Sequence, residues 1–330
     1  MKCRVCRGPA IIDIRRHNAN FCVEHFLRLC RDQTAKAIKQ FSMIEPDDRV
    51  LVAVSGGKDS LALWDLLLDL GYRADGLYVG LGIDEYSEES GHHARAFANR
   101  RGVELIEIDL RSEYGYDIPS GARAARRAPC STCGLSKRHL FDRAALDGGY
   151  DAVATGHNLD DEAAVLFGNV LHWHTDYLAR QLPVLEARAG FPRKIKPLVR
   201  LGEREMAAYC LVRGIEYQVD ECPMAAGNRH LAYKEALNAI ESRSPGAKHE
   251  FYFGYLARAS DRFRENIAEE QDALGSCERC GAPTPAPVCA FCRLLDQAGG
   301  SQPVTLRPRH GSGDIPQPNT GLDPTRAGGA

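Results

Sequence analysis

Residues 50–60 have the sequence VLVAVSGGKDS, and this stretch decides the fold. The apolar run at its start predicts a buried strand, and the glycine pair at 56–57 predicts a tight turn into a following helix. Such a turn presents successive backbone N–H groups to an anion, and Lys58 adds a positive charge. The spacing differs from the Walker A pattern G-x-x-x-x-G-K-[ST] and from the dinucleotide pattern G-x-G-x-x-G. The stretch therefore predicts another type of pyrophosphate-binding loop. A plain glycine turn, capped by Ser55 or Asp59, is the disfavoured alternative.

Outward from this loop, strand-like apolar runs alternate with helix-like patterns. Strands are predicted at 50–54, 74–81, 103–110 and 151–155, and helices at 59–70, 87–101, 135–146 and 160–171. This alternation predicts an α/β fold with a doubly wound parallel sheet and helices on both faces. Ligands of such sheets bind at the carboxyl ends of the strands, where the strand order reverses. The loop is therefore expected at the ligand site.

Composition limits the size, the surface charge and the location that we expect of the protein. The chain has 330 residues, 44% of them hydrophobic, which suits one large α/β domain with small satellites. Lys and Arg total 42 against 44 Asp and Glu, so any surface that attracts a polyanion must be local. Residues 1–46 and 188–213 have such a local excess of Lys and Arg, typical of RNA contacts or of a solvated helix face. Because neither a secretion signal nor a membrane span is visible, we expect a cytoplasmic protein without membrane contact.

Cysteines provide the second strong pattern. Twelve of them in a chain without an export signal favour metal ligation or catalysis over disulfides. Two sets have the paired spacing of closed, structural zinc sites. They are Cys3, Cys6, Cys22 and His25 near the N-terminus, and Cys277, Cys280, Cys289 and Cys292 near the C-terminus. Each segment is too short to bury a core unaided, so zinc is expected to hold both together.

These sets divide the chain into four parts. We predict an N-terminal zinc finger at 1–25, a catalytic domain with linking helices at 26–270 and a C-terminal zinc ribbon at 271–295. Residues 296–330 include seven Gly and five Pro and have almost no periodic apolar pattern. That composition predicts a disordered tail.

Five cysteines remain outside the two zinc sets. Cys30 and Cys210 lie in apolar helical patterns and are predicted core residues. Cys130 and Cys133, just before the helix predicted from residue 135, and the distant Cys222 have polar surroundings. Three thiolates could bind zinc with an open position, form a redox pair with a spare thiol, or hold an iron–sulfur cluster with one iron that no residue ligates. The residues alone leave these three possibilities open.

Two motifs resemble those of a known superfamily. Residues 55–60 resemble the PP-loop of the ATP-pyrophosphatases, whose members typically adenylate a substrate oxygen and release pyrophosphate. Residues 156–162, GHNLDDE, resemble the second signature of the tRNA-modifying branch. With both motifs in the expected order, the chain is identified as a member of this superfamily, which implies an adenine-nucleotide hydrolase-like fold. Asn158 and Asp160 are expected to cap helices.

The resemblance implies that ATP and magnesium bind at this site. The expected nucleotide-binding residues are Ala53 and Val79 for adenine, and Ser55, Gly56, Gly57, Lys58, Asp59, Ser60, Lys137, Gly156 and Asp161 around the phosphates. Lys58 is expected to neutralise phosphate charge, while Asp59 and Asp161 position magnesium or substrate. Lys137, one helical turn beyond Cys133, is the fourth expected catalytic residue, as a cation of the ATP site.

The cysteines narrow the resemblance further. A C-x-x-C pair with a distant third Cys inside a PP-loop enzyme is similar to the tRNA thiolation group, whose members hold a 4Fe-4S cluster on three cysteines. This implies that Cys130, Cys133 and Cys222 hold such a cluster, whose open iron could carry sulfide to the activated base. With a zinc finger on each side, residues 1–295 resemble the tRNA 2-thiouridine synthetases that accept sulfur from a ubiquitin-like protein. That family implies tRNA and the sulfur carrier as partners, and a homodimer.

Three alternatives compete with this interpretation. A tRNA 2-thiocytidine synthetase shares the loop and the cluster cysteines but is not expected to have both zinc sites. A PP-loop ligase acting on a small molecule is disfavoured by the zinc sites and the cysteine trio. A carrier that binds nucleotide without turnover is disfavoured by the intact Lys58, Asp59 and Asp161. No residue distinguishes one tRNA position from another.

Overall fold

The computed structural model describes residues 1–188, 190–225, 229–264 and 274–301. In these residues a central sheet has six strands: β3 (Arg49–Val54), β4 (Arg73–Gly80), β5 (Leu105–Asp109), β6 (Ala152–Thr155), β7 (Val184–Leu185) and β8 (Arg193–Ile195). Their order is β5-β4-β3-β6-β8-β7, and all neighbours pair in parallel except β7, which runs antiparallel to β8 at the edge. The order reverses between β3 and β6. The predicted doubly wound sheet is confirmed, with an additional antiparallel edge strand.

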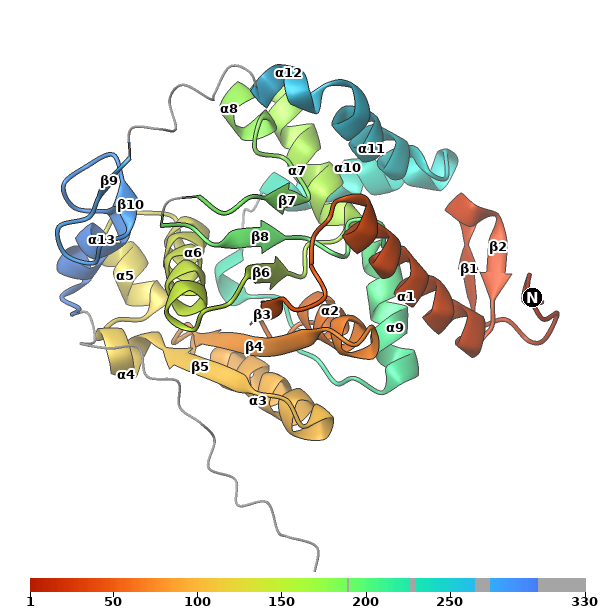
Figure 1. The fold of residues 1–330 in the computed structure, drawn as a ribbon, viewed down its shortest axis with the longest axis horizontal. Helices are drawn as coiled ribbons and strands as arrows, with labels where there is room; N and C mark the ends of the chain where they lie inside the picture. The colour runs from red at the N-terminus through yellow and green to blue at the C-terminus, as the bar shows by residue number, and fades with distance from the viewer. Residues whose placement is uncertain (189, 226–228, 265–273, 302–330) are drawn as a thin grey trace, which may run out of the picture.

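Side chains alternate between the two faces of the sheet, as the pleat requires. Val50, Val52 and Val54 of β3 belong to one hydrophobic core, whereas Leu51 belongs to another on the opposite face. The first core packs against α1 (Val23–Gln40), α2 (Lys58–Asp69), α3 (Asp84–Arg101), α7 (Leu159–Leu171), α9 (Glu203–Arg213) and α11 (Ala247–Arg258). The second packs against α4 (Leu110–Tyr114), α5 (Ile118–Ala124), α6 (Pro129–Asp147) and α13 (Ala290–Ala298). Helices therefore cover both faces (Figure 1).

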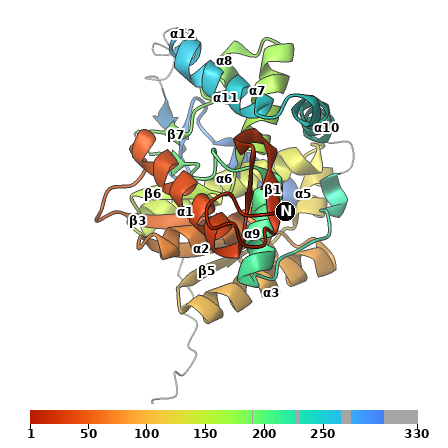
Figure 2. The same cartoon turned by 90° about the vertical axis from the view of Figure 1, so that its right-hand side faces the viewer.

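The remaining helices pack around α7 and α11. They are α8 (Thr175–Leu178), α10 (Arg229–Arg243) and α12 (Ser260–Arg264), with the short 3-10 segments η1 (Arg15–His17) and η2 (Pro223–Ala225) elsewhere. Figure 2 shows α7, α11 and α12 at one end of the molecule and α3 at the other, with the strands between them. None of the helices in the described residues has the length and apolar character needed to cross a membrane.

Helix α6 begins earlier than the sequence analysis predicted. It starts at Pro129, not near residue 135, so Cys130 and Cys133 lie within its first turns. Proline suits the first position of a helix because the N–H that it lacks has no partner there. The polar, glycine-containing segment just before residue 135 is therefore helical. Helix α3 likewise begins at Asp84, and β5 is shorter than the run predicted at 103–110.

The two terminal segments lie at opposite ends of the molecule (Figure 1). The N-terminal hairpin of β1 (Ile12–Ile14) and β2 (Ala19–Phe21) contributes to the first core, and the C-terminal hairpin of β9 (Gly275–Ser276) and β10 (Pro283–Thr284) precedes α13. Phe291 and Leu294 of α13 join the second core. Apolar contacts thus anchor each finger on the sheet domain.

The predicted tail boundary at residue 296 is too early. Helix α13 continues to Ala298 because Leu294 and Leu295 are buried, and it ends at Gly299, whose φ is +71°. The Ser301 N–H donates a hydrogen bond to the Tyr114 carbonyl (3.1 Å). The rest of the predicted tail, residues 302–330, lies outside the described residues.

Candidate functional site

The PP-loop (residues 55–60) joins the carboxyl end of β3 to α2 at the point where the strand order reverses. Gly56 has a φ of +77°, and a Cβ at this position would lie 2.2 Å from the Ser90 carbonyl oxygen, so only glycine fits. The Ser55 N–H donates to Ser60 Oγ (3.1 Å), and Ser60 Oγ donates to the Gly57 carbonyl (3.0 Å). These bonds fix the turn, and α2 begins at Lys58 without a side-chain cap. Its positive end therefore faces the turn, as phosphate binding requires.

The second signature is in backbone contact with this loop. Gly156 directly follows β6, the parallel neighbour of β3. A Cβ on Gly156 would lie 2.8 Å from the Ser60 nitrogen. The close approach accounts for the glycine and places both signatures at one edge of the sheet, as their positions in the sequence predicted.

Asn158 connects the two signatures through its side chain. Its Oδ1 accepts hydrogen bonds from the N–H groups of Asp160 (2.9 Å) and Asp161 (3.2 Å), and Asp161 Oδ2 accepts one from the Asn158 N–H (3.0 Å). The predicted cap is therefore confirmed. Asn158 Nδ2 also donates to Asp59 Oδ1 (3.0 Å) and so fixes the orientation of the Asp59 carboxylate.

Asp160 caps a helix other than its own. Its Oδ2 accepts a hydrogen bond from the Glu203 N–H (3.0 Å), the first residue of α9, and it forms an ion pair with Lys248 of α11. Sequence reasoning predicted a cap for this residue but could not identify the helix, because α9 begins more than forty residues later. The contact positions Glu203 next to the loop.

Two lysines and three carboxylates meet above the loop. Lys58 Nζ lies 2.8 Å from Glu203 Oε1 and 3.2 Å from Asp59 Oδ2. Lys234 Nζ, from α10, lies 2.6 Å from Asp161 Oδ1 and 3.1 Å from Glu203 Oε2. Glu203 thus bridges the two lysines, one oxygen to each. No sequence motif marks Glu203 or Lys234, although both lie in the centre of the site.

The charges of this cluster are set by burial and by neighbouring groups. Burial raises the pKa of Asp59 to about 6; Lys58 opposes the shift and Asp161 adds to it. Burial would also raise the pKa of Glu203, but the hydrogen bond from Lys58 and the charge of Lys234 lower it to about 2. Burial alone would lower the pKa of Lys58 and Lys234, but the neighbouring carboxylates raise both. At neutral pH the lysines and Glu203 are therefore charged, and Asp59 is the group that titrates closest to neutrality.

The two residues expected at adenine lie on adjacent strands. Ala53 of β3 is half-buried and pairs with Leu77 of β4, and Val79 is two residues further along β4. The Val79 side chain is buried in the second core, so only its backbone is available to a ligand. Adenine binding at these residues stays a prediction.

Lys137 lies on α6 beside Cys133 and apart from the charged cluster. Burial raises the pKa of Cys133, and the charge of Lys137 opposes that shift. Within the described part of the chain, no ion pair or side-chain hydrogen bond joins Lys137 to the PP-loop. Its role at ATP stays a prediction.

Both terminal ligand sets are compact. The four ligand atoms of Cys3, Cys6, Cys22 and His25 lie within 4.8 Å of one another, and so do those of Cys277, Cys280, Cys289 and Cys292. In the second set, the Cys289 N–H donates to Cys277 Sγ (3.3 Å). Burial opposes ionisation of Cys277, but this and further backbone hydrogen bonds lower its pKa to about 6, which favours the thiolate. Each set fits one tetrahedral zinc ion.

The three remaining polar cysteines come close together without forming a compact set. All twelve cysteines lie in the described residues and none forms a disulfide. Cys130 Sγ lies 3.6 Å from the Met224 carbonyl, two residues beyond Cys222, and both Cys222 and Cys130 influence the pKa of Cys133. Their sulfur atoms nevertheless fall outside the 4.8 Å grouping of the terminal sets. The wider spacing suits a multi-iron cluster better than a single ion.

The fold and the site define a PP-loop protein with a metal-binding finger at each end. Residues 29–230 match the PP-loop domain family, and residues 2–27 match the N-terminal LIM domain of 2-thiouridine synthetase TtuA. The chain is 50% identical to tRNA-5-methyluridine(54) 2-sulfurtransferase of Thermus thermophilus over 90% of this chain and 91% of that protein. It is 41% identical to the protein of that name from Pyrococcus horikoshii, over 89% and 93%. The chain therefore belongs to the family of TtuA-type tRNA 2-sulfurtransferases.

A solved structure agrees with this assignment. The U34-tRNA thiolase NcsA from Methanococcus maripaludis, with its [4Fe-4S] cluster, superimposes with a TM-score of 0.75 and 25% identity over 90% of this chain and 96% of that one. The comparisons confirm the predicted fold, family and enzyme class, and they support ATP, an iron–sulfur cluster and zinc as cofactors. The 2-thiocytidine and small-molecule alternatives are not favoured.

Proposed function

We propose that this protein replaces O2 of uridine 54 in tRNA with sulfur. The observation that carries the proposal is the identity of 50%, 41% and 38% to three relatives that all have the name tRNA-5-methyluridine(54) 2-sulfurtransferase. The structural relative that is named for position 34 is only 25% identical. The substrate is therefore a 5-methyluridine in the T-loop and the product its 2-thio derivative.

The first step is adenylation of the base. The uridine O2 attacks the α-phosphorus of ATP, the bond from that phosphorus to the bridging oxygen breaks, and pyrophosphate leaves. The PP-loop N–H groups and Lys58 stabilise the charge that develops on pyrophosphate. Asp59 and Asp161 are the carboxylates that would hold the magnesium ion of the nucleotide. Asn158 positions Asp59 for this role.

Lys234 is a second cation for the same phosphates. Glu203 holds Lys58 and Lys234 with one oxygen each, at 2.8 Å and 3.1 Å. A triphosphate that enters the site takes the place of the Glu203 carboxylate between the two ammonium groups. Glu203 therefore keeps both lysines charged and in position before ATP binds, which lowers the cost of reorganisation on binding.

The second step exchanges oxygen for sulfur. A sulfur nucleophile attacks C2 of the base, the C2–O bond breaks and AMP leaves, so the base gains sulfur without a change in oxidation state. We assign a 4Fe-4S cluster to Cys130, Cys133 and Cys222, where it would supply an iron with an open position for sulfide. The charge of Lys137 beside Cys133 favours the thiolate that ligation requires.

The partners follow from the same family. A ubiquitin-like carrier with a C-terminal thiocarboxylate supplies the sulfur: water attacks the thiocarboxylate carbon, the C–S bond breaks, the carboxylate forms and the sulfur leaves as hydrosulfide. The two zinc fingers have no open ligand position and act as structural elements. We expect a homodimer located in the cytoplasm, where tRNA and ATP are present and thiols stay reduced.

Nucleoside mass spectrometry of tRNA tests the proposal. A strain that lacks the gene should lose 5-methyl-2-thiouridine, and digestion to oligonucleotides should map the loss to position 54. The gene with Lys58→Ala should fail to restore the modification. Loss at position 34 instead would correct the substrate, whereas unchanged 2-thiouridine at both positions would reject the function.

A further inference from the structure

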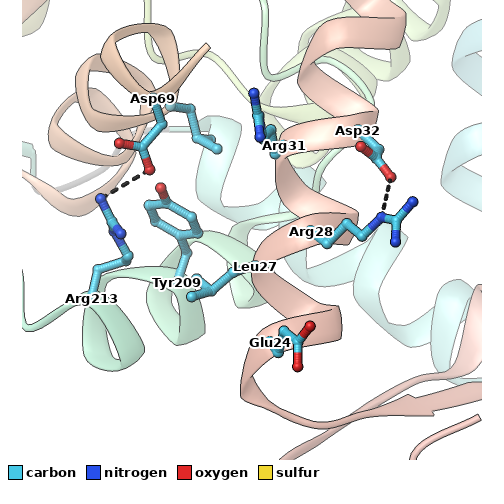
Figure 3. A pocket seen from close by; sticks show the side chains of 9 residues that line it. Glu24, Leu27, Arg28, Arg31, Asp32, Asp69, Tyr209 and Arg213 are labelled. Carbon is cyan, nitrogen blue, oxygen red and sulfur yellow. Dashed lines mark ion pairs between the residues drawn. The ribbon is translucent and has the colours of Figure 1, made fainter. Parts of the chain in front are cut away.

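Two hollows on the surface differ in their charge. One, of about 490 Å³, lies between α1, α2 and α9 (Figure 3). Its charged lining is balanced, with Arg28, Arg31 and Arg213 against Glu24, Asp32 and Asp69. Two ion pairs, Arg28–Asp32 at 3.6 Å and Arg213–Asp69 at 2.9 Å, satisfy most of these groups. This hollow has no net charge to attract an ionic ligand.

The other hollow, which we call the α6 groove, is larger and strongly basic. It has a volume of about 790 Å³ and lies between α6, the β7–β8 hairpin and the C-terminal ribbon. Six cationic side chains line it: Arg138, Arg143, Arg180, Arg188, Lys194 and Arg264. Among its described lining residues the acidic side chains are Asp142 and Glu186. This local excess contrasts with the net charge of −2 of the whole chain.

The cations differ in how far they are already neutralised. Lys194 lies 2.7 Å from Asp142, and Arg143 lies 2.8 Å from Asp147. Arg138 and Arg180 are exposed, and neither forms a salt bridge or a side-chain hydrogen bond within the described part of the chain. At least two guanidinium groups are therefore available to an anionic partner, and guanidinium binds phosphate well.

The wall of the groove also presents an aromatic face. The Arg188 guanidinium lies 5.0 Å from the centre of the Phe191 ring, and Lys194 Nζ lies 5.9 Å from it. Phe191 is half-buried. Cations beside an aromatic ring are typical of sites that bind unpaired RNA, where phosphates meet the charges and bases stack on rings. An acidic protein surface would use the charges but not this combination.

The groove and the proposed chemistry share helix α6. Its α6 lining begins at Leu135, two residues beyond Cys133, and continues to Leu146. At 1.5 Å rise per residue, the distance along α6 from Cys133 to Arg143 is about 15 Å. The groove residues of α6, from Leu135 to Leu146, follow the i, i+3, i+4 spacing of one helix face. Cys130, Cys133 and Lys137 lie on the opposite face, so a nucleic acid bound along the groove would reach them past the N-terminal end of α6.

We infer that the α6 groove binds the phosphate backbone of the substrate tRNA, with Arg138 and Arg180 as phosphate contacts. This inference rests on the proposed function, because it takes tRNA as the partner. The groove would fix the tRNA body while its target uridine is at the PP-loop. Phosphate contacts position the substrate and do not read its sequence.

The salt dependence of tRNA binding tests this assignment. Affinity is measured for the full-length wild type, Arg138→Gln, Arg180→Gln and the double variant over a series of salt concentrations. Each single substitution removes one phosphate neighbour and should reduce the slope of log K against log[salt] by about one, and the double variant by about two. ATP affinity and zinc content should stay at wild-type values. Arg28→Gln with Arg31→Gln, in the balanced hollow, is the matched control and should leave the slope unchanged.

Each other outcome overturns the inference in a recognisable way. A wild-type slope in the double variant would show that the groove does not contact RNA. If the same variant bound the sulfur carrier more weakly, the groove would belong to that protein. If the slope decreased equally in the Arg28→Gln, Arg31→Gln control, the effect would come from the overall charge of the protein and not from the groove. Failure of the wild type to bind any tRNA would instead contradict the proposed function.

Discussion

The two terminal ligand sets and the central cysteine trio all place ligand residues at the start of a helix. They differ in whether four ligands lie close enough together to enclose one ion. Cys22 and Cys289 occupy the N-cap positions of α1 and α13, and His25 and Cys292 follow in the first turns, just as Cys130 and Cys133 lie in the first turns of α6. In all three places the two residues are three apart in the sequence and lie at the N-terminal end of a helix. In the terminal sets a second nearby pair completes four ligands within 4.8 Å, whereas Cys222 reaches the central pair from a distant segment.

The difference separates structural from chemical metal sites. A closed set of four ligands satisfies a zinc ion and leaves no position for a substrate. Three ligands with wider spacing leave one position open. Cys130 is exposed and Cys133 and Cys222 are half-buried, and the first two lie on the helix that also carries Lys137. Removing a terminal ligand should therefore damage the fold first, and removing a central ligand should damage the chemistry first.

The largest effect is expected from Cys222→Ala. The variant should lose its iron and essentially all thiolation, because two cysteines cannot hold the cluster, but it should still bind ATP. Iron analysis and nucleoside mass spectrometry of the reaction product measure both effects. Cys30→Ala, which removes a buried thiol of α1, is the control and should keep its iron. Full activity in Cys222→Ala would contradict a cluster held on three cysteines.

Lys58→Ala should come next, with a loss of roughly 100- to 1,000-fold in the rate of pyrophosphate release. The lysine is a point charge on the phosphates, so circular dichroism and metal content should match the wild type. Both the iron of the trio and the zinc of the fingers should remain. A variant that retains the wild-type rate would remove Lys58 from the mechanism.

Lys234→Gln should have a smaller effect on the same step, about tenfold, which corresponds to ~1.4 kcal/mol. Pyrophosphate release and the affinity for free pyrophosphate should both fall, because the cation is proposed to contact the leaving group. Lys234→Arg keeps the charge and should recover most of the rate. If Lys234→Gln loses thiolation while it binds pyrophosphate normally, the lysine acts elsewhere.

Cys277→Ala should reverse the pattern of Cys222→Ala. We expect loss of one zinc and a decrease in Tm of about 5 to 10 °C, with little change in pyrophosphate release per folded molecule. Apolar contacts of Phe291 and Leu294 with the second core should limit the damage. Differential scanning calorimetry and zinc analysis test this. A variant of wild-type stability with a slow chemical step would contradict the structural role.

The smallest effect concerns pH. Because the pKa of Asp59 is raised to about 6, its carboxyl is protonated below that pH and loses its charge interaction with Lys58 and with any bound cation. The rate of pyrophosphate release should therefore fall several-fold between pH 7 and pH 5. The Asp59→Asn variant should release pyrophosphate slowly at every pH, and its rate should not fall between pH 7 and pH 5. If the rate of Asp59→Asn still falls between pH 7 and pH 5 as in the wild type, another group is responsible for the pH dependence.

Local sequence signals predicted most of the fold and half of the site. The strands and the PP-loop were predictable because apolar runs, glycine pairs and their order are local features, and the paired cysteines had a recognisable spacing. The start of α6 was missed because its first turns are polar and contain glycine, although Pro129 is a start signal. Strands β7 and β8 have two and three residues, too few for a visible period.

The other half of the site depends on tertiary contacts. Glu203 and Lys234 lie on α9 and α10, more than forty residues beyond the second signature, and no motif marks them. Only the folded chain brings their side chains to Lys58 and Asp161. Asp160 shows the same limit, because its cap is for α9 and not for the adjacent helix.

Elemental analysis of anaerobically purified protein is the most direct test of the contrast between the two kinds of metal site. Iron and zinc are counted per chain in the wild type and in Cys222→Ala. We predict about four irons in the wild type, as expected for a 4Fe-4S cluster, together with one zinc for each of the two compact ligand sets. Cys222→Ala should lose the iron and keep both zinc ions. A third zinc ion in place of the iron, or iron that persists in Cys222→Ala, would contradict the assignment of the cluster to Cys130, Cys133 and Cys222.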